Sequence, residues 1–402
     1  MSFKESKLFA LIKELSFYEF SKYGKICDEE NRFPCENFEL IKKHKLQAIM
    51  VPKEYGGFGL NFLEYQQALT EISKGCSATA SAFNMHNIVV GGAASINLEH
   101  LDERSKSKII NFLIKIYHMT VEEKKIFAAA TTEQGIGSRF SLVKTNYQKI
   151  DDKYIINGSK SFVTMATYAD YYMVLANKCT DHDKLSDSSL LSYFLIPRHA
   201  KGVSIKKNWN VLGMRGTDSH EVIFKDVTLE RSDLFMGAEG FALSKVIREP
   251  HWITGGYLGV YLGIMEAAFE FSCYYIKEKT NSKNQSGLGY QPLIQARVSE
   301  MYTLLNHARL VLNDAAQKVV TSQGSEETNN AIFNAKYVIG ESAIQLTSLA
   351  IKTCGGSAIF KEYDLERHFR DSRCGALMPT VSDACQLYLG RHLLGIKENF
   401  IW

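Results

Sequence analysis

The spacing of hydrophobic residues divides the chain into three stretches. Up to about residue 117, apolar side chains recur mostly at three- and four-residue intervals, which is typical of amphipathic helices; examples are Leu63, Tyr65, Leu69 and Ile72. From about residue 122 to 235 the pattern changes to short β-branched and aromatic runs between Gly, Asn and Asp turns, at 154–156, 172–175, 193–196 and 222–224, which predicts strands. Helical spacing returns from residue 239, in long segments at 253–279, 293–322, 329–353 and 381–394.

This order of elements predicts an α+β fold, because helices, strands and helices follow one another in separate blocks. We expect an N-terminal helical domain over residues 1–121, a middle antiparallel β domain over residues 122–236 and a C-terminal helical bundle over residues 237–402. A chain of 402 residues is long enough for two or three domains with cores of their own.

Composition excludes some functions without identifying one. The net charge of +3 is too small to predict binding to nucleic acid or to a membrane surface. No segment reaches the roughly 18 apolar residues of a membrane span, and the apolar run at residues 8–12 is too short for a signal peptide. The eight cysteines form no Cys-x-x-Cys pair, so we expect no metal site and a reducing, cytoplasmic location.

The segment from Phe127 to Ala176 carries the most specific pattern. A small-residue strand leads into Thr132-Glu133 and a Gly135-Ile136-Gly137-Ser138 turn, and later strands end on Lys160-Ser161-Phe162-Val163-Thr164. Glycines at a strand end let backbone N–H groups converge on an anion such as a pyrophosphate. An aromatic residue followed by a hydroxyl suits a flat ring system. A Gly-Ser turn on its own is more often a plain loop than a phosphate site.

Further motifs follow in a fixed order: 211–217 (VLGMRGT), 222–227 (VIFKDV), Gly355-Gly356, 363–367 (YDLER) and 370–373 (RDSR). This ordered set resembles the acyl-CoA dehydrogenase family, from about residue 50 to residue 395. The resemblance implies a C-terminal four-helix bundle, bound FAD and the α,β-dehydrogenation of an acyl thioester carried by CoA or an acyl carrier protein. It also implies a homodimer or homotetramer, and a flavoprotein or oxygen as electron acceptor.

The resemblance also assigns residues to the cofactor. Thr132, Phe162, Val163 and Thr164 are expected at the isoalloxazine ring, and Gly137 and Ser138 at the pyrophosphate. Family members usually have tryptophan where Phe162 stands, so the ring is kept and an N–H donor is lost. Lys279 replaces an arginine that reaches the FAD phosphates of a neighbouring subunit, and Ser282 replaces a phenylalanine, which puts that contact in doubt. Gln295 is expected on the adenine side, and Gly355 and Gly356 where the backbone approaches FAD.

One position departs from the family pattern. Dehydrogenation needs a carboxylate to remove the α-proton, and Pro379 stands where the family glutamate is expected. In some relatives the carboxylate lies on the first long bundle helix, at the position of Ile253. We expect Glu249, one turn earlier, to be the first candidate base, followed by Asp383 and His251. Each has a structural alternative: carboxylates also favour helix starts, where they cap or complement the dipole.

Loss of the base leaves a second function open. Flavin monooxygenases of the same fold lack the glutamate and oxygenate a small apolar or biosynthetic substrate, and some carry a histidine after a small-residue helix. The run 77–85 followed by His86 matches that pattern, although a lone histidine on a helix is more often structural. A third alternative is a flavin-binding fold that has lost catalysis. The flavin-loop residues Thr132, Gly137, Ser138 and Thr164 argue against it.

Overall fold

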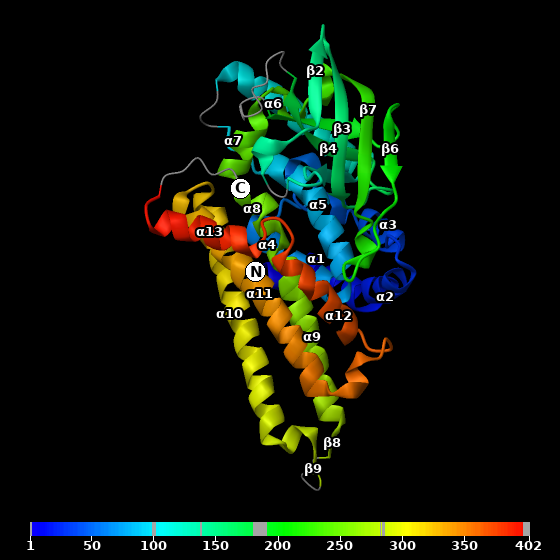
Figure 1. Cartoon of the computed structure of the whole chain (residues 1–402), viewed down its shortest axis with the longest axis vertical. Helices are drawn as coiled ribbons and strands as arrows, with labels where there is room; N and C mark the ends of the chain where they lie inside the picture. Colours follow the sequence, from blue (N-terminus) through cyan, green and yellow to red (C-terminus); the bar gives the residue numbers. More distant parts are fainter. Residues whose placement is uncertain are drawn as a thin grey trace.

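The computed structural model describes residues 2–98, 102–136, 139–179, 191–281, 283 and 286–396. Figure 1 shows the large β sheet at one end of the long axis and the long C-terminal helices running to the other end. The N-terminal part of the chain forms the helices α1 (Lys7–Leu15), α2 (Ser21–Glu30), α3 (Cys35–Lys43), α4 (Phe62–Gly75), α5 (Ser77–Ala94) and α6 (Glu103–Val121). In Figure 1, α4 and α5 lie between the sheet and the long helices, and α6 lies at the level of the sheet. None of the described helices is long and apolar enough to cross a membrane.

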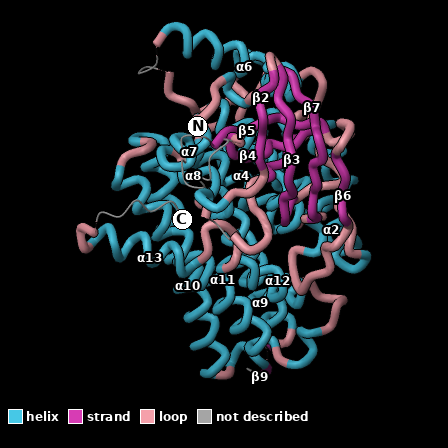
Figure 2. The backbone as a smooth tube through the Cα atoms, turned by 45° about the horizontal axis from the view of Figure 1, so that its top comes forward, coloured by secondary structure: helices cyan, strands magenta, loops and turns pink. Residues whose placement is uncertain are grey.

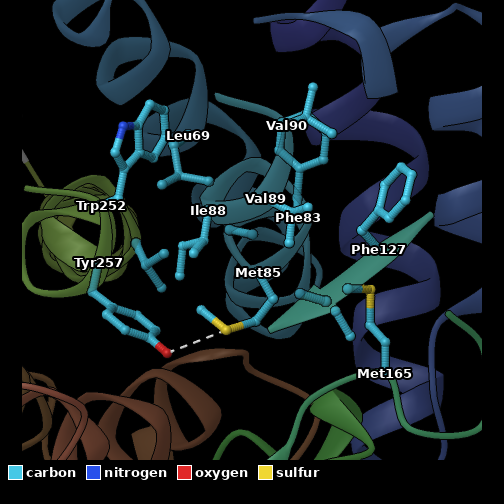
Figure 3. Close-up of a cluster of buried hydrophobic side chains, with 14 of the residues drawn as sticks. Leu69, Phe83, Met85, Ile88, Val89, Val90, Phe127, Met165, Trp252 and Tyr257 are labelled. Carbon is cyan, nitrogen blue, oxygen red and sulfur yellow. Dashed lines mark hydrogen bonds between the residues drawn. The ribbon is translucent and has the colours of Figure 1, made fainter. Parts of the chain in front are cut away.

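Helix α5 lies in the interior. Every residue from Ser77 to Ala93 is buried, including the small residues at its start, so the helix has partners on all sides. It packs against β1 on one side and against α4 and the start of the bundle on others. Gly91 allows one of these contacts, because a Cβ at this position would overlap the ring of Trp252. Figure 3 shows Trp252 and Tyr257 on one side of α5 and Phe127 on another.

The β domain is one twisted sheet with the order β1-β4-β2-β3-β7-β6, in which β5 pairs with the other edge of β4. Most pairings are antiparallel, as expected, but β1 and β2 both run parallel to β4. Parallel neighbours need a long connection between them. The hairpin β2–β3 lies between β1 and β4 in sequence and provides that connection. Figure 2 shows the strands side by side. Their bounds are β1 Phe127–Ala130, β2 Asn146–Ile150, β3 Lys153–Val163, β4 Tyr171–Lys178, β5 Leu191–Pro197, β6 Val203–Lys206 and β7 His220–Glu230.

Helices return after β7. Short α7 (Phe241–Arg248) and α8 (Pro250–Ile253) lead through a 3₁₀ turn into α9, and a small hairpin of β8 (Thr280–Asn281) and β9 (Ser286–Gly287) turns the chain into α10. Pro292 begins α10 at a position where its missing N–H costs nothing. The long bundle helices are α9 (Leu258–Glu278), α10 (Pro292–Ser322) and α11 (Glu326–Cys354), followed by α12 (Leu365–Ser372) and α13 (Ser382–Leu393).

Candidate functional site

A cavity of about 450 Å³ lies where the β domain, the N-terminal helices and the bundle meet. The ends of β1 and β3 form one wall, α5 and the α8–α9 segment form a second, and the loop between α12 and α13 forms a third. Mostly apolar hollows of a few hundred cubic ångströms are typical of small-molecule and cofactor sites. The cavity is therefore the first place in the molecule to look for chemistry.

The strand wall carries Thr132, Phe162 and Thr164 together. The Ser161 N–H donates to the Thr132 carbonyl oxygen at 2.8 Å, which joins the two strand ends. Phe162 has a φ of 58°, in the left-handed region that a bulky residue rarely adopts, and 63% of it is exposed. An aromatic side chain held open beside an apolar hollow is suited to cover a flat ring.

A buried ion pair lies behind this wall. Lys160 Nζ donates to Glu133 Oε1 at 2.7 Å, and the N–H groups of Lys144 and Thr145 donate to the same carboxylate at 2.8 and 2.9 Å. Burial would raise the pKa of Glu133, but the ammonium and the N–H donors outweigh it and hold that pKa below its usual value. Burial lowers the pKa of Lys160 to about 8, so both groups are charged at neutral pH. The pair fixes the strand ends, because Lys160 Nζ also donates to the Thr131 carbonyl at 3.4 Å.

The helical wall carries Met85 and Ile88 from α5, with Ile253 and Tyr257 opposite them. The Tyr257 hydroxyl donates to Met85 Sδ at 3.7 Å (Figure 3), and burial raises the pKa of this phenol above its usual value. Tyr257 follows Ile253 by four residues in a helical stretch, so both lie on one face.

Both positions that the resemblance offers for a base lie on the cavity. Ile253 and Pro379 are both lining residues, and Thr254 Oγ1 and Thr380 Oγ1, which follow them, are 2.8 Å apart in a hydrogen bond. Neither isoleucine nor proline can accept a proton. Among the described residues that line the cavity there is no Asp, Glu or His, and Arg373 is the charged one.

Glu249, the first candidate base, does not line this cavity. Its carboxylate accepts from Lys245 Nζ at 2.5 Å, and the same ammonium donates to the Gly92 carbonyl at 2.6 Å. Only about 9% of either side chain is exposed. The pair therefore ties α7 to the end of α5, away from the vacant base positions.

Asp383 and His251 also lie outside the lining. Asp383 is exposed in the first turn of α13. His251 is buried against the rings of Phe62 and Trp252, and burial lowers its pKa to about 3. It lines a different hollow of about 320 Å³ between α8, the start of α4 and the end of α10.

His86 has two hydrogen bonds within the protein. Its Nε2 lies 2.8 Å from the Gln47 carbonyl oxygen, and its Nδ1 accepts from the Phe127 N–H at 3.2 Å. These contacts require the neutral tautomer with the proton on Nε2. The ring stacks between Phe83 and Phe127, and burial lowers its pKa to about 4. His86 faces β1, whereas its neighbour Met85 faces the cavity.

The other predicted flavin residues that the structure describes do not line the cavity. Val163 is buried in the core, paired with His220 across β3 and β7, and Gly137, Ser138 and Ser282 lie outside the described residues. The remaining ones are found where α9 and α11 end and α10 begins, at the end of the bundle away from the β domain (Figure 1). These residues are Lys279, Gln295, Gly355 and Gly356, all of them exposed.

The sequence reasoning missed Tyr257, Met85, Arg373 and Cys374 as cavity residues. Tyr257 could have been found, because it is one helical turn after Ile253 and so shares its face. The loop residues Arg373 and Cys374 had no comparable signal, since their position depends on the path of the chain between two helices.

Comparisons with known proteins agree with this architecture. The profiles "Acyl-CoA dehydrogenase, N-terminal domain", "middle domain" and "C-terminal domain" match residues 12–109, 128–227 and 256–378. The 3-(aryl)acrylate reductase of Clostridium sporogenes is 29% identical over 96% of this chain and 97% of its own. Butyryl-CoA dehydrogenase of Megasphaera elsdenii superposes with a TM-score of 0.82 at 24% identity, over 98% and 100% of the chains. FMN-bound TdsC of Paenibacillus sp. A11-2 superposes with a TM-score of 0.83 at 21% identity, over 98% of each chain.

Proposed function

The chain belongs to the acyl-CoA dehydrogenase family of FAD-dependent oxidoreductases, and from this we propose that it interconverts a saturated acyl thioester and its α,β-unsaturated form. The observation that carries the proposal is the cavity, because its strand wall suits a flavin ring and its helical wall is apolar enough for an acyl group. A curated relative over nearly the whole chain is named a 3-(aryl)acrylate reductase, so the reverse reaction is included.

The residues on the strand wall fit FAD. Phe162 is open beside the cavity, Thr132 and Ser161 are joined by a backbone hydrogen bond, and Thr164 Oγ1 shares a hydrogen bond with Ser219 Oγ at 2.9 Å. We assign these side chains to the isoalloxazine ring. When bound, FAD supplies a hydride acceptor, or in its reduced form a hydride donor, for the β-carbon. The protein's part is to place the acyl chain against this wall and keep water out.

The proton at the α-carbon is the open part of the chemistry. In our proposal Glu249 is a structural ion pair rather than the base, since Lys245 and the burial of the pair hold its carboxylate away from the cavity. Asp383, His251 and His86 stay predictions for this role, and none of them lines the cavity. The described residues that line the cavity offer hydroxyl groups but no carboxylate for this step.

The test starts with the ultraviolet-visible spectrum of the purified protein, which is expected to show bound oxidised flavin. Anaerobic titration with butyryl-CoA and with 3-phenylpropanoyl-CoA then reads flavin reduction as bleaching, and the reverse is read with the unsaturated thioesters and reduced enzyme. The same titration with acyl groups on carrier protein identifies the carrier. A protein that binds neither FAD nor FMN contradicts the proposal, as does a flavin that no thioester reduces or reoxidises.

Oxygenation is the second candidate. The observation that favours it is the cavity lining, in which the described residues supply no carboxylate or histidine. The experiment that separates the two functions is the same anaerobic titration. If thioesters leave the flavin unchanged, and reduced enzyme consumes oxygen to hydroxylate or sulfoxidise an apolar substrate, the oxygenase function replaces the dehydrogenase.

We also propose that a second copy of the chain completes the FAD site. Lys279 and Gln295 are exposed where α9 ends and α10 begins, and neither lines the cavity that carries Phe162. A partner related by two-fold symmetry could bring them to the phosphates and adenine of the first copy's FAD. A homodimer or homotetramer is expected by light scattering at micromolar concentration, with Lys279→Met weakening FAD binding. A monomer that binds FAD fully contradicts this.

A further inference from the structure

The hydroxyl of Tyr257 is a buried donor with a poor acceptor. Tyr257 is 5% exposed and lines the cavity, and the acceptor that the described residues give it is Met85 Sδ at 3.7 Å. A thioether is a weak acceptor, and a buried hydroxyl without a good partner is unfavourable. A tyrosine phenol is protonated at neutral pH, and burial raises the pKa of this one further above its usual value. A ligand oxygen near Met85 would give the O–H a much better partner (Figure 3).

Few other donors are available on this side of the cavity. Pro379, in the loop that faces the α8–α9 segment, has no backbone N–H, and the side chains of Met85, Ile88 and Ile253 have no donors. The hydroxyls of Thr132, Ser161 and Thr164 belong to the opposite wall, which we assign to the flavin. Arg373 is exposed at the loop, in contrast to buried Tyr257. Tyr257 is therefore the buried hydroxyl donor that the described residues place on this side of the cavity.

We propose that Tyr257 donates its hydroxyl proton in a hydrogen bond to the carbonyl oxygen of the acyl thioester. The role rests on the proposed function, since it requires a thioester in this cavity. No bond forms or breaks in this contact. The hydrogen bond draws electron density towards the carbonyl oxygen, where negative charge builds up when the α-proton leaves or when a hydride adds at the β-carbon. It lowers the barrier of both directions, which matters most where the described lining residues supply no carboxylate.

Oxidised enzyme with an unsaturated thioester provides a direct test, because this pair does not react. Cinnamoyl-CoA is the probe: its absorption band moves to longer wavelength when its carbonyl is polarised. We expect a red shift on binding to the wild-type flavoprotein. Tyr257→Phe keeps the ring but removes the donor, so the red shift is lost and the dissociation constant rises about 3- to 10-fold, the range for one neutral hydrogen bond.

Tyr261→Phe is the matched control. Tyr261 is one turn further along, in α9. Its buried hydroxyl has no hydrogen-bond partner among the residues that the structure describes, and it does not line the cavity. This variant is expected to keep the red shift and the affinity. Flavin content and circular dichroism show that each variant is folded.

The outcomes separate the two proposals. A full red shift in folded Tyr257→Phe overturns the role of Tyr257 while leaving the proposed function in place. A red shift that is lost in Arg373→Gln but kept in Tyr257→Phe does the same and assigns the donor to Arg373. A wild-type protein that binds flavin but neither cinnamoyl-CoA nor any saturated thioester overturns the proposed function, and the role of Tyr257 with it.

Discussion

Lys160→Met tests whether the buried ion pair behind the strand wall stabilises the fold and the flavin site. Methionine keeps most of the side-chain volume but removes the cation, so the Glu133 carboxylate stays buried without its charged partner. Lys160 is fully buried and Glu133 is 6% exposed, so water cannot replace the lost contact. The N–H groups of Lys144 and Thr145 still donate to the carboxylate.

The expected magnitude follows from these contacts. Removing one member of a buried pair costs about 3–5 kcal/mol of unfolding free energy. Two backbone donors stay with Glu133, so we expect the lower end, about 3 kcal/mol. The double variant Lys160→Met/Glu133→Gln removes both charges, and its cost is expected to be well below the sum of the two single variants. Because Lys160 also contacts the Thr131 carbonyl, the FAD dissociation constant of Lys160→Met is expected to rise about tenfold, or 1.4 kcal/mol.

Urea unfolding followed by tryptophan fluorescence measures the first quantity, and quenching of flavin fluorescence measures the second. The matched control is Lys153→Met, at the start of the same strand. Lys153 forms an ion pair with Glu230, and the two side chains are 58% and 60% exposed. Exposed pairs contribute about 0–1 kcal/mol. If Lys160→Met costs no more than Lys153→Met, or if the double variant costs the sum of its parts, the argument from burial is refuted.

Three further predictions concern proton transfer in the cavity and the buried histidine His86. Glu249→Gln is expected to change the rate of flavin reduction by less than about threefold while lowering stability; a loss of about 100-fold, the scale of general-base catalysis, would make Glu249 the base after all. Pro379→Glu, with Pro379→Gln as control, is expected to speed bleaching by a saturated thioester at least tenfold, and no gain would show that α-proton removal does not limit the rate. The pKa of His86 is about 4 in the folded protein and about 6.5 when the chain is unfolded. Between these pH values the unfolded chain binds more protons, so the free energy of unfolding falls as the pH is lowered. For this residue the loss reaches up to about 3 kcal/mol. His86→Gln is expected to flatten that acid dependence in urea titrations, and an unchanged slope would contradict the assignment.

Hydrophobic spacing predicted the architecture because periodicity reports which face of an element is buried. It predicted less well where backbone geometry interrupts an element. Glu249 is four residues before Ile253, so an unbroken helix would place both on one face. Pro250 disfavours the helical conformation in the residue before it, and Glu249 has φ −128° and ψ 51°. The side chain therefore leaves the cavity face. Asp383, four residues after Pro379, is separated from it because α13 begins only at Ser382.

The placement of His86 shows a similar limit. Helix α5 is buried on all sides, so its hydrophobic pattern does not distinguish the face towards the cavity from the face towards β1. Met85 and Ile88, three residues apart, face the cavity, while His86 turns to the Gln47 carbonyl and the Phe127 N–H. Only the tertiary arrangement decides between these faces. The sequence pattern alone therefore could not say which face of α5 carries His86.

The lack of a carboxylate at Ile253 and Pro379 constrains the substrate more than the direction of the reaction. Oxidation and reduction pass through the same transition state, so the absence of a base slows both and cannot by itself make the protein a reductase. The barrier must be lowered in other ways: by a donor at the carbonyl oxygen, the role proposed for Tyr257, and by the substrate itself. An aryl group on the β-carbon conjugates with the forming double bond, and the sulfur atoms of Met85, Met173 and Met378 around the cavity offer favourable contacts to an aromatic ring. We therefore expect a 3-arylpropanoyl thioester to bind and react better than a short aliphatic one, and the comparison of 3-phenylpropanoyl-CoA with butyryl-CoA measures that difference directly.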